Sequence, residues 1–122
     1  MFRNLCAIMM LACTCTVHAQ GEDPILVYQK AVNYLEASMA SEQEVYMGFA
    51  LLEQLAEDEW SVAQNRLGEC LEQGLGVTRD LDEAMVWYQR AADQGHPIAQ
   101  SNLIRLKKAQ ALTAAGPGDT FF

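Results

Sequence analysis

Few residues of this 122-residue chain have the types and spacing that catalysis requires. Cys70 is a potential nucleophile, and His96 is the only histidine after residue 18, but no recognisable pattern pairs either of them with a partner base. The segment 74–76 carries two glycines, yet it lacks the third glycine and the preceding strand of a nucleotide-binding loop. We therefore predict that the chain is not an enzyme and that its function depends on its surface.

The acidic residues form no recognisable metal site. Glu53 and Glu57 share one helix face, but no histidine accompanies them. The acidic run 57–59 lacks the alternating ligands of a calcium loop, so a solvated helix end is the simpler interpretation. We expect no metal and no cofactor.

The chain is acidic, with a formal net charge of −8 at pH 7. Binding to nucleic acid or to anionic lipid requires a basic surface, so neither is expected as a partner. Electrostatics favour a basic protein partner, whose encounter rate would fall with added salt. Alternatively, the acidity serves only solubility.

The first 19 residues have the features of a secretory signal peptide. Arg3 gives a positive start, residues 5–12 are apolar, and Val17-His18-Ala19 is a small-x-small cleavage site. A buried N-terminal helix is the alternative interpretation. Cleavage after Ala19 leaves 103 residues, with no integral membrane segment, in the periplasm or secreted.

The cysteines fit an exported protein whose domain has no internal disulfide. Cys6, Cys13 and Cys15 lie in the presumed leader, which leaves Cys70 alone in the mature chain. Attachment of a lipid anchor to Cys13 is the alternative to a soluble exported protein, although the residue three positions before Cys13 is not the usual leucine. Cys70 is predicted to be a small core residue rather than a reactive thiol, because no histidine or lysine stands near it in the helical pattern.

Apolar residues recur at spacings of three and four, which predicts five helices. They cover residues 25–38, 45–58, 63–73, 81–94 and 97 to about 114. Expected N-caps are Asp23, Ser41 (with Glu44 in a capping box) and Asp80. The first helix is predicted to bury one face, which consists of Ile25, Tyr28, Ala31, Val32 and Leu35.

The helical hairpin between residues 63 and 95 resembles the Sel-1-like repeat, a relative of the tetratricopeptide repeat. The resemblance rests on Ala63, Leu67, Gly68, Gly74, Gly76, Val77, Asp80, Ala84, Trp87, Tyr88, Ala91, Ala92 and Gly95. Cys70 departs from the pattern, since the family usually carries tyrosine there. The resemblance implies an all-α fold, a short right-handed α/α solenoid of antiparallel helix pairs that serves as a scaffold for protein–protein contacts.

A 36-residue period divides the chain. Ala63-Gln64 is repeated by Ala99-Gln100, which indicates a helical solenoid. We predict a domain over 20–114, with a degenerate repeat at 25–60, a clear repeat at 61–96 and a capping helix at 97–114. Residues 115–122 form a tail whose Phe121-Phe122 either folds back or docks on another protein.

The aromatic residues and the surface are assigned from the same pattern. Trp87 and Tyr88 are predicted core residues. The first helix of each pair usually lines the concave side of such stacks, so the predicted partner-binding residues are Gln64, Glu69, Gln73 and Gln100. Trp60 lies at a junction between helices and either plugs it or anchors a partner.

Three classes of function are compatible with these features. The leading hypothesis is a secreted or periplasmic adaptor, with an immunity protein against a secreted toxin as a special case that the resemblance suggests. A cell-wall or β-lactam hydrolase, an activity attributed to some secreted relatives, is the second hypothesis. The third is a partial solenoid that self-associates or is completed by a neighbour in an envelope assembly.

Overall fold

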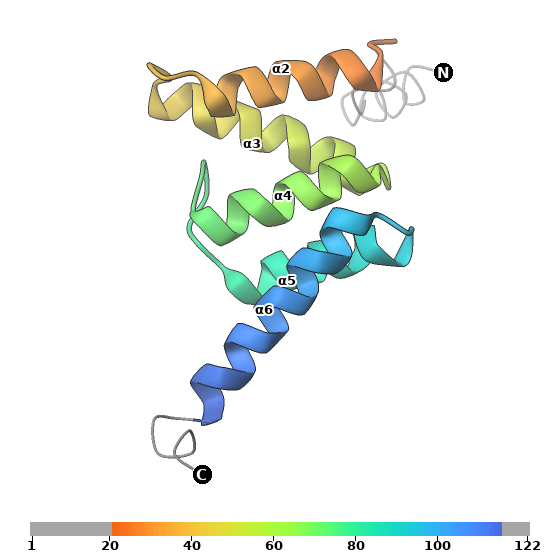
Figure 1. Cartoon of the computed structure of the whole chain (residues 1–122). Helices are drawn as coiled ribbons and strands as arrows, with labels where there is room; N and C mark the ends of the chain where they lie inside the picture. The colour runs from red at the N-terminus through yellow and green to blue at the C-terminus, as the bar shows by residue number, and fades with distance from the viewer. Residues whose placement is uncertain (1–20, 116–122) are drawn as a thin grey trace, which may run out of the picture.

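The computed structural model describes residues 21–115, which form five α-helices arranged one after another (Figure 1). They are α2 (Pro24–Glu36), α3 (Glu42–Glu57), α4 (Ser61–Gln73), α5 (Leu81–Asp93) and α6 (Pro97–Ala115). Each helix packs against the next along the chain, which confirms the predicted all-α fold of adjacent pairs. The predicted signal peptide with Cys13, and the tail with Phe121-Phe122, lie outside the described residues.

Local sequence explains where the helices begin. Asp23 caps α2 with its carboxylate. Ser41 and Glu44 form a capping box at α3, in which the Glu44 carboxylate accepts the Ser41 backbone N–H at 2.8 Å. Asp80 caps α5 by accepting the Glu83 backbone N–H at 3.0 Å. All three caps lie at the predicted positions, because side-chain oxygens satisfy the otherwise unpaired N–H groups of a first turn.

The loop between α4 and α5 depends on two glycines. Gly74 ends α4 with φ 72°, and Gly76 follows with φ 74°, both in the left-handed region. Gly76 also lies against α3, where an added Cβ would stand 2.8 Å from the carbonyl oxygen of Val45. The loop therefore fixes the second helix pair to the first.

Buried side chains of all five helices form one continuous core. Its fully buried members include Leu52, Leu67, Leu71 and Tyr88. The small signature residues Ala63, Gly68, Ala84 and Ala91 are buried as well, and Ala92 is half-buried. The predicted core role of the aromatic pair and of Cys70 is confirmed, because Trp87, Tyr88 and Cys70 are all buried.

The buried face of α2 includes the predicted Ala31 and Leu35, but Ile25 is not part of it. Ile25 is 62 % exposed, whereas Val27 is 1 % exposed. The buried stripe runs through Val27, Ala31 and Leu35, which are four residues apart. Ile25 also fits an apolar spacing, but it lies in the first turn, on the side away from α3 and α4 that contributes nothing to the core.

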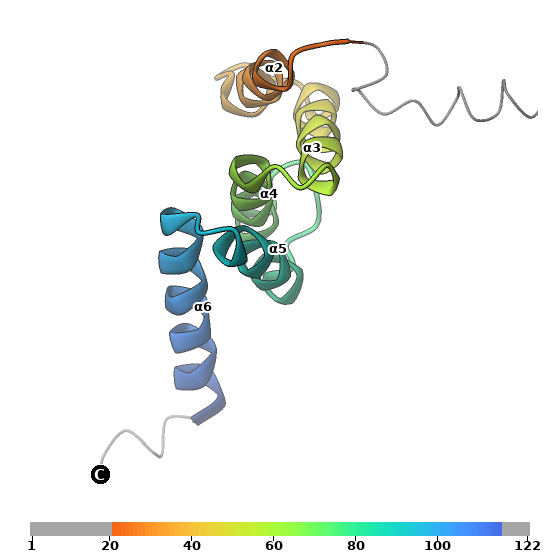
Figure 2. The same cartoon turned by 90° about the vertical axis from the view of Figure 1, so that its right-hand side faces the viewer.

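The helices alternate between two sides of the stack. Figure 2 shows α2, α4 and α6 on one side and α3 and α5 on the other. First helices of the pairs thus share a common face, as the repeat pattern implies. Between residues 21 and 115, no helix combines the length and the apolar character needed to cross a membrane.

Candidate interaction surface

An open groove of about 290 Å³ is lined by residues of α2 and α4 and of the start of α6. Its lining consists of Tyr28, Gln29, Val32 and Glu36 from α2, Val62, Asn65, Arg66 and Glu69 from α4, and His96 and Ile98 at the start of α6. We call it the α2–α4–α6 groove. The lining combines apolar side chains with charged and polar ones.

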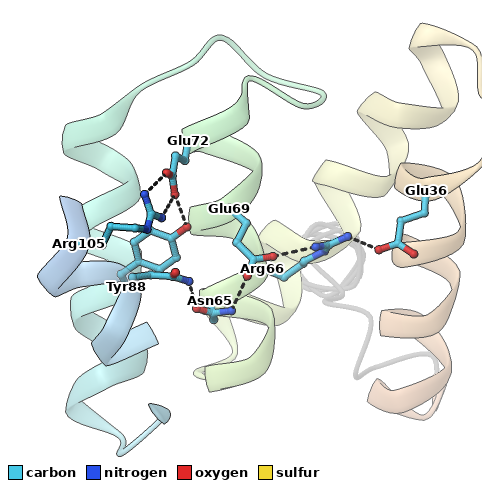
Figure 3. Close-up of polar contacts among 8 residues, drawn as sticks. Glu36, Asn65, Arg66, Glu69, Glu72, Tyr88 and Arg105 are labelled. Atoms are coloured by element: carbon cyan, nitrogen blue, oxygen red, sulfur yellow. Dashed lines mark hydrogen bonds and ion pairs between the residues drawn. The ribbon is translucent and has the colours of Figure 1, made fainter. Parts of the chain in front are cut away.

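Arg66 is the central charge of the groove (Figure 3). Its guanidinium forms an ion pair with Glu36 of α2 and donates to Glu69 of its own helix at 2.8 Å. Less than a quarter of the Arg66 side chain is exposed, while Glu36 is mostly exposed. Hydrogen bonding from two sides fixes the guanidinium, so the floor of the groove is preorganised.

A chain of amides extends this network to α6. Asn65 donates to Glu69 at 3.0 Å, and Asn102 of α6 donates to the Asn65 side-chain oxygen at 3.2 Å. Asn65 is buried, and these two bonds use both of its side-chain polar atoms. Polar contacts therefore connect α2, α4 and α6 along the floor of the groove.

A second cluster holds the far end of α4 against α5 and α6 (Figure 3). The two terminal nitrogens of the Arg105 guanidinium, Nη1 and Nη2, donate to the Glu72 carboxylate at 2.7 and 2.8 Å, and the Tyr88 hydroxyl donates to the same carboxylate at 2.9 Å. Hydrogen bonding by Arg105 lowers the pKa of Glu72 below its usual value. Burial raises the pKa of Tyr88, so this hydroxyl remains a donor.

Trp60 belongs to the interior of the junction between α3 and α4. Its ring meets that of Tyr28 edge to face, with centroids 5.3 Å apart and planes at 90°. The residue is half-buried and packs against the core. Of the two roles predicted for Trp60, the structure supports the plug.

The prediction that Gln64 faces a partner is wrong, because its side chain is fully buried. Its amide donates to the Ala56 carbonyl at 3.1 Å and to Glu59 at 3.3 Å. Gln94 donates in turn to the Gln64 side-chain oxygen at 2.8 Å. Gln64 thus joins the C-terminal ends of α3 and α5 inside the stack and is a structural residue.

The other predicted surface residues are spread over more than one site. Glu69 lines the α2–α4–α6 groove. Gln73 and Gln100 are exposed but do not line it, and Gln100 lies instead in a shallow depression between α5 and α6. The structure therefore brings only Glu69 of the predicted set into the groove.

Sequence reasoning missed Arg66 and Glu36 as parts of this site. They are 30 residues apart, so no local pattern relates them. One signal was available: an arginine on the first helix of a repeat, next to the polar residues expected on the concave side. The pairing itself depends on the distance between α2 and α4.

Cys70 and His96 are the two residues considered as catalytic candidates, and each has a structural environment instead. Cys70 is buried, and burial raises the pKa of its thiol to about 11. His96 lies at the groove edge, where its Nδ1 accepts the Ala99 backbone N–H at 3.2 Å. Between residues 21 and 115, no group of three or more His, Cys, Asp or Glu side chains is placed to hold a metal ion.

Consecutive helix pairs with a shared core and an open polar groove on one face define a helical-repeat scaffold. The family model for the Sel1 repeat matches residues 7–38 and 61–96, which together make more than half of the chain. The chain belongs to the Sel1 repeat family. Sel1 repeats generally mediate protein interactions.

Two similar proteins each match about 70 % of the chain. DAP3-binding cell death enhancer 1 from Rattus norvegicus is 36 % identical over an alignment of 106 residues, and the match covers 73 % of this chain and 20 % of that protein. The crystal structure of a Sel1 repeat protein from Oxalobacter formigenes has a TM-score of 0.62 at 29 % identity, covering 70 % of this chain and 64 % of that one. The chain thus spans about a fifth of the rat protein and slightly less than two thirds of the solved structure.

Proposed function

We propose that the chain is an exported adaptor that binds a segment of another protein in the α2–α4–α6 groove. The observation that carries this proposal is that one groove crosses three helices, so a linear segment contacts all of them at once. Tyr28, Val32 and Ile98 supply apolar walls. Arg66, fixed by its carboxylate partners, supplies a rigid polar floor, which lowers the entropy lost on binding.

The favoured partner segment is basic and partly apolar. Glu36 is largely exposed at the groove edge, and the whole chain has a net charge of −8. These charges attract a cationic segment and raise its encounter rate, an effect that salt screens. The apolar walls then account for retention once the segment is seated.

Export is part of the proposal and is supported by the sequence of the leader. The positive start at Arg3, the apolar residues 5–12 and the cleavage site at Ala19 are the supporting features. They favour a location in the periplasm or outside the cell. A partner in that compartment is therefore the one to seek.

Binding is favoured over catalysis by the state of the candidate nucleophile. The Cys70 thiol is buried, and with a pKa of about 11 it stays protonated at neutral pH. His96 uses its Nδ1 to cap the start of α6. Neither residue is placed to activate a substrate in the groove.

Two matched substitutions test the proposal. Val62→Arg fills the groove with a cation, and Val86→Arg makes the same change on α5, outside this groove; the original side chains are 37 % and 57 % exposed, so both variants should fold. Tagged full chains are exposed to extracts of the exported compartment at low and high salt, and bound proteins are identified by mass spectrometry.

We expect one stoichiometric partner that elutes with salt from wild type and from Val86→Arg. Its retention by Val62→Arg should fall at least about tenfold, as for a central interface position. Equal retention by the two variants would show that the partner binds elsewhere. The absence of any partner at either salt concentration would contradict the adaptor proposal itself.

A further inference from the structure

A second groove lies between α2 and α3, which form the N-terminal end of the stack (Figure 1). Its volume is about 210 Å³, and its lining is mainly apolar: Lys30, Tyr34, Tyr46, Met47, Ala50, Leu51 and Gln54. We call it the α2–α3 groove. Small-molecule pockets have volumes of about 300–1,000 Å³, so this hollow suits individual side chains of a protein segment better than a separate ligand.

The two grooves lie on opposite sides of α2. Tyr28, Val32 and Glu36 line the first groove, whereas Lys30 and Tyr34 line the second. Positions two residues apart on a helix differ by about 200° around its axis. No residue lines both grooves, so an occupied groove leaves the other one free.

Large side chains with apolar surface are exposed in the α2–α3 groove. Tyr46 is 63 % exposed and Met47 is 45 % exposed, and both line the hollow. Exposed apolar side chains that gather in this way mark interaction surfaces. Tyrosine is also among the residues that most often dominate the binding energy of an interface.

The net charge of the described residues is concentrated in the first hairpin. Residues 21–60 carry nine acidic side chains and one basic side chain, whereas residues 61–115 carry six of each sign. The hairpin that forms the α2–α3 groove therefore has a net charge of −8, and the rest of the described stack is neutral. A local excess of this size attracts cationic groups and repels another acidic surface.

Three exposed glutamates extend along the groove side of α3. They are Glu42, Glu53 and Glu57. Offsets of −4, +7 and +11 from Tyr46 place them on the face of the helix that carries this tyrosine. Between residues 21 and 115, no hydrogen bond or ion pair engages their carboxylates, whereas two other glutamates of the hairpin are paired with arginines of the second half.

We propose that the α2–α3 groove binds a cationic amphipathic segment of another protein. Apolar side chains of the segment fill the hollow beside Tyr46 and Met47, and its lysines or arginines pair with the glutamates along α3. Lys30 lines the α2 wall and repels a cation there, so the basic side chains of the segment face α3. This site does not require the α2–α4–α6 groove to be occupied.

A second copy of the chain is a poorer occupant. Its first hairpin carries the same negative excess, and its residues 61–115 bring no net charge to offset it. Two such hairpins repel each other when they meet. The charge of the groove therefore favours a basic partner over self-association.

A synthetic peptide is the probe for this site. It consists of leucines and lysines over about four helical turns, with the leucines on one face. A control peptide has the same composition, but its leucines are spread around the helix, so it reports the effect of charge alone. Fluorescence anisotropy of the labelled peptides, titrated with the full chain, measures Kd.

Two matched substitutions locate the peptide. Tyr46→Ser removes the aromatic side chain from the groove, and Ile25→Ser makes a similar change outside both grooves, since the original side chains are 63 % and 62 % exposed. We expect Tyr46→Ser to raise Kd at least about tenfold, as for one central interface side chain, and Ile25→Ser to stay within about twofold of wild type. Equal affinities of the two variants would show that charge alone holds the peptide and would overturn the proposal. Equal binding of the two peptides by wild type would overturn it too.

The glutamates of α3 are tested by a change of charge. Glu53→Gln alters the groove side of α3, and Glu83→Gln removes the same charge from an exposed position on α5. We expect Glu53→Gln to raise Kd about two- to fivefold, the scale of an exposed ion pair, and Glu83→Gln to have no effect. Equal losses would mean that the net charge of the chain attracts the peptide, which contradicts pairing along α3.

Val62→Ser distinguishes this inference from the proposed adaptor function, because Val62 lines the α2–α4–α6 groove. We expect it to leave the affinity for the peptide unchanged. A loss as large as that of Tyr46→Ser would place the peptide in the α2–α4–α6 groove and would overturn the present proposal alone. Light scattering without peptide is the last control: self-association that Tyr46→Ser abolishes would assign the α2–α3 groove to a second copy and would also overturn the proposal.

Discussion

The contact between Gly68 and Tyr88 shows how one residue sets the spacing of two helices. An added Cβ at Gly68 would lie 2.6 Å from Cε1 of the fully buried Tyr88 ring. The ring cannot withdraw freely, because its hydroxyl donates to Glu72 at 2.9 Å. Small side chains at such positions allow the close approach of helices that stacking requires.

Gly68→Ala should therefore destabilise the protein. Alanine favours a helix over glycine by about 1 kcal/mol, but overpacking a core costs about 1–3 kcal/mol. The two terms leave a net loss of up to about 2 kcal/mol in the free energy of unfolding, measured in urea. The control is the same change in a Tyr88→Leu background, where the clashing ring atoms are absent. A loss of equal size in both backgrounds would contradict this explanation.

Single residues also mark where sequence reasoning reached its limit. Local spacing predicted Trp87, Tyr88 and Cys70 as core residues, and all three are buried. The same spacing placed Gln64 at the surface, since a buried glutamine cannot be told from an exposed one without its partners. Those partners, Ala56 and Gln94, lie 8 and 30 residues away, at the ends of other helices.

At the scale of elements, the loop between α4 and α5 connects consecutive pairs. Gly76 and Gly95 both have positive φ, 74° and 86°, and both follow a helix of the repeat. An added Cβ at Gly76 meets the Val45 carbonyl oxygen at 2.8 Å, whereas at Gly95 it meets nothing within 4 Å. A comparison of substitutions at the two glycines therefore distinguishes two costs. Backbone strain is present at both positions, whereas a clash with α3 is present only at Gly76.

Gly76→Ala should cost more than Gly95→Ala. Each substitution forces a left-handed conformation on a residue with a Cβ, which costs about 1–2 kcal/mol. Gly76→Ala should add about 1–3 kcal/mol, because the loop must move away from α3. Urea unfolding of the two variants measures the difference. Equal losses would mean that the loop does not hold the pairs together.

The order of elements was the most predictable feature of the fold. Caps at Asp23, Ser41 and Asp80 are local signals, and each helix follows its predicted cap. The groove was less predictable, because it depends on the distance between α2 and α4 that brings Glu36 to Arg66. The role of Trp60 was open for the same reason, and its contact with Tyr28, 32 residues earlier, decides it.

The two ends of the molecule differ in a way that the 36-residue period makes clear. At the C-terminal end, Lys107 stands where the core residue Leu71 stands one repeat earlier, and Ile104 stands at the position of Gly68. A lysine and a large side chain at these positions leave no seat for another Sel1-type helix. The corresponding positions of the first repeat, Leu35 and Val32, both carry apolar side chains, and Leu35 is buried in the core.

Lys107→Leu should reopen the C-terminal end. Lys107 lines a hollow of about 400 Å³ between α5 and α6 together with Met85, Val86 and Leu103, so the substitution joins a fourth apolar side chain to these three. The polar side chains Asp82, Gln89, Arg90 and Gln110 remain around them. We expect self-association at least about tenfold tighter than that of wild type, about 1.4 kcal/mol, the scale of one buried aliphatic side chain. Light scattering over a concentration series measures it. Lys108→Leu, at the position that corresponds to Glu72, is the matched control and should behave as wild type. If both variants associate equally, general hydrophobicity explains the effect, and Lys107 is not the residue that closes the stack.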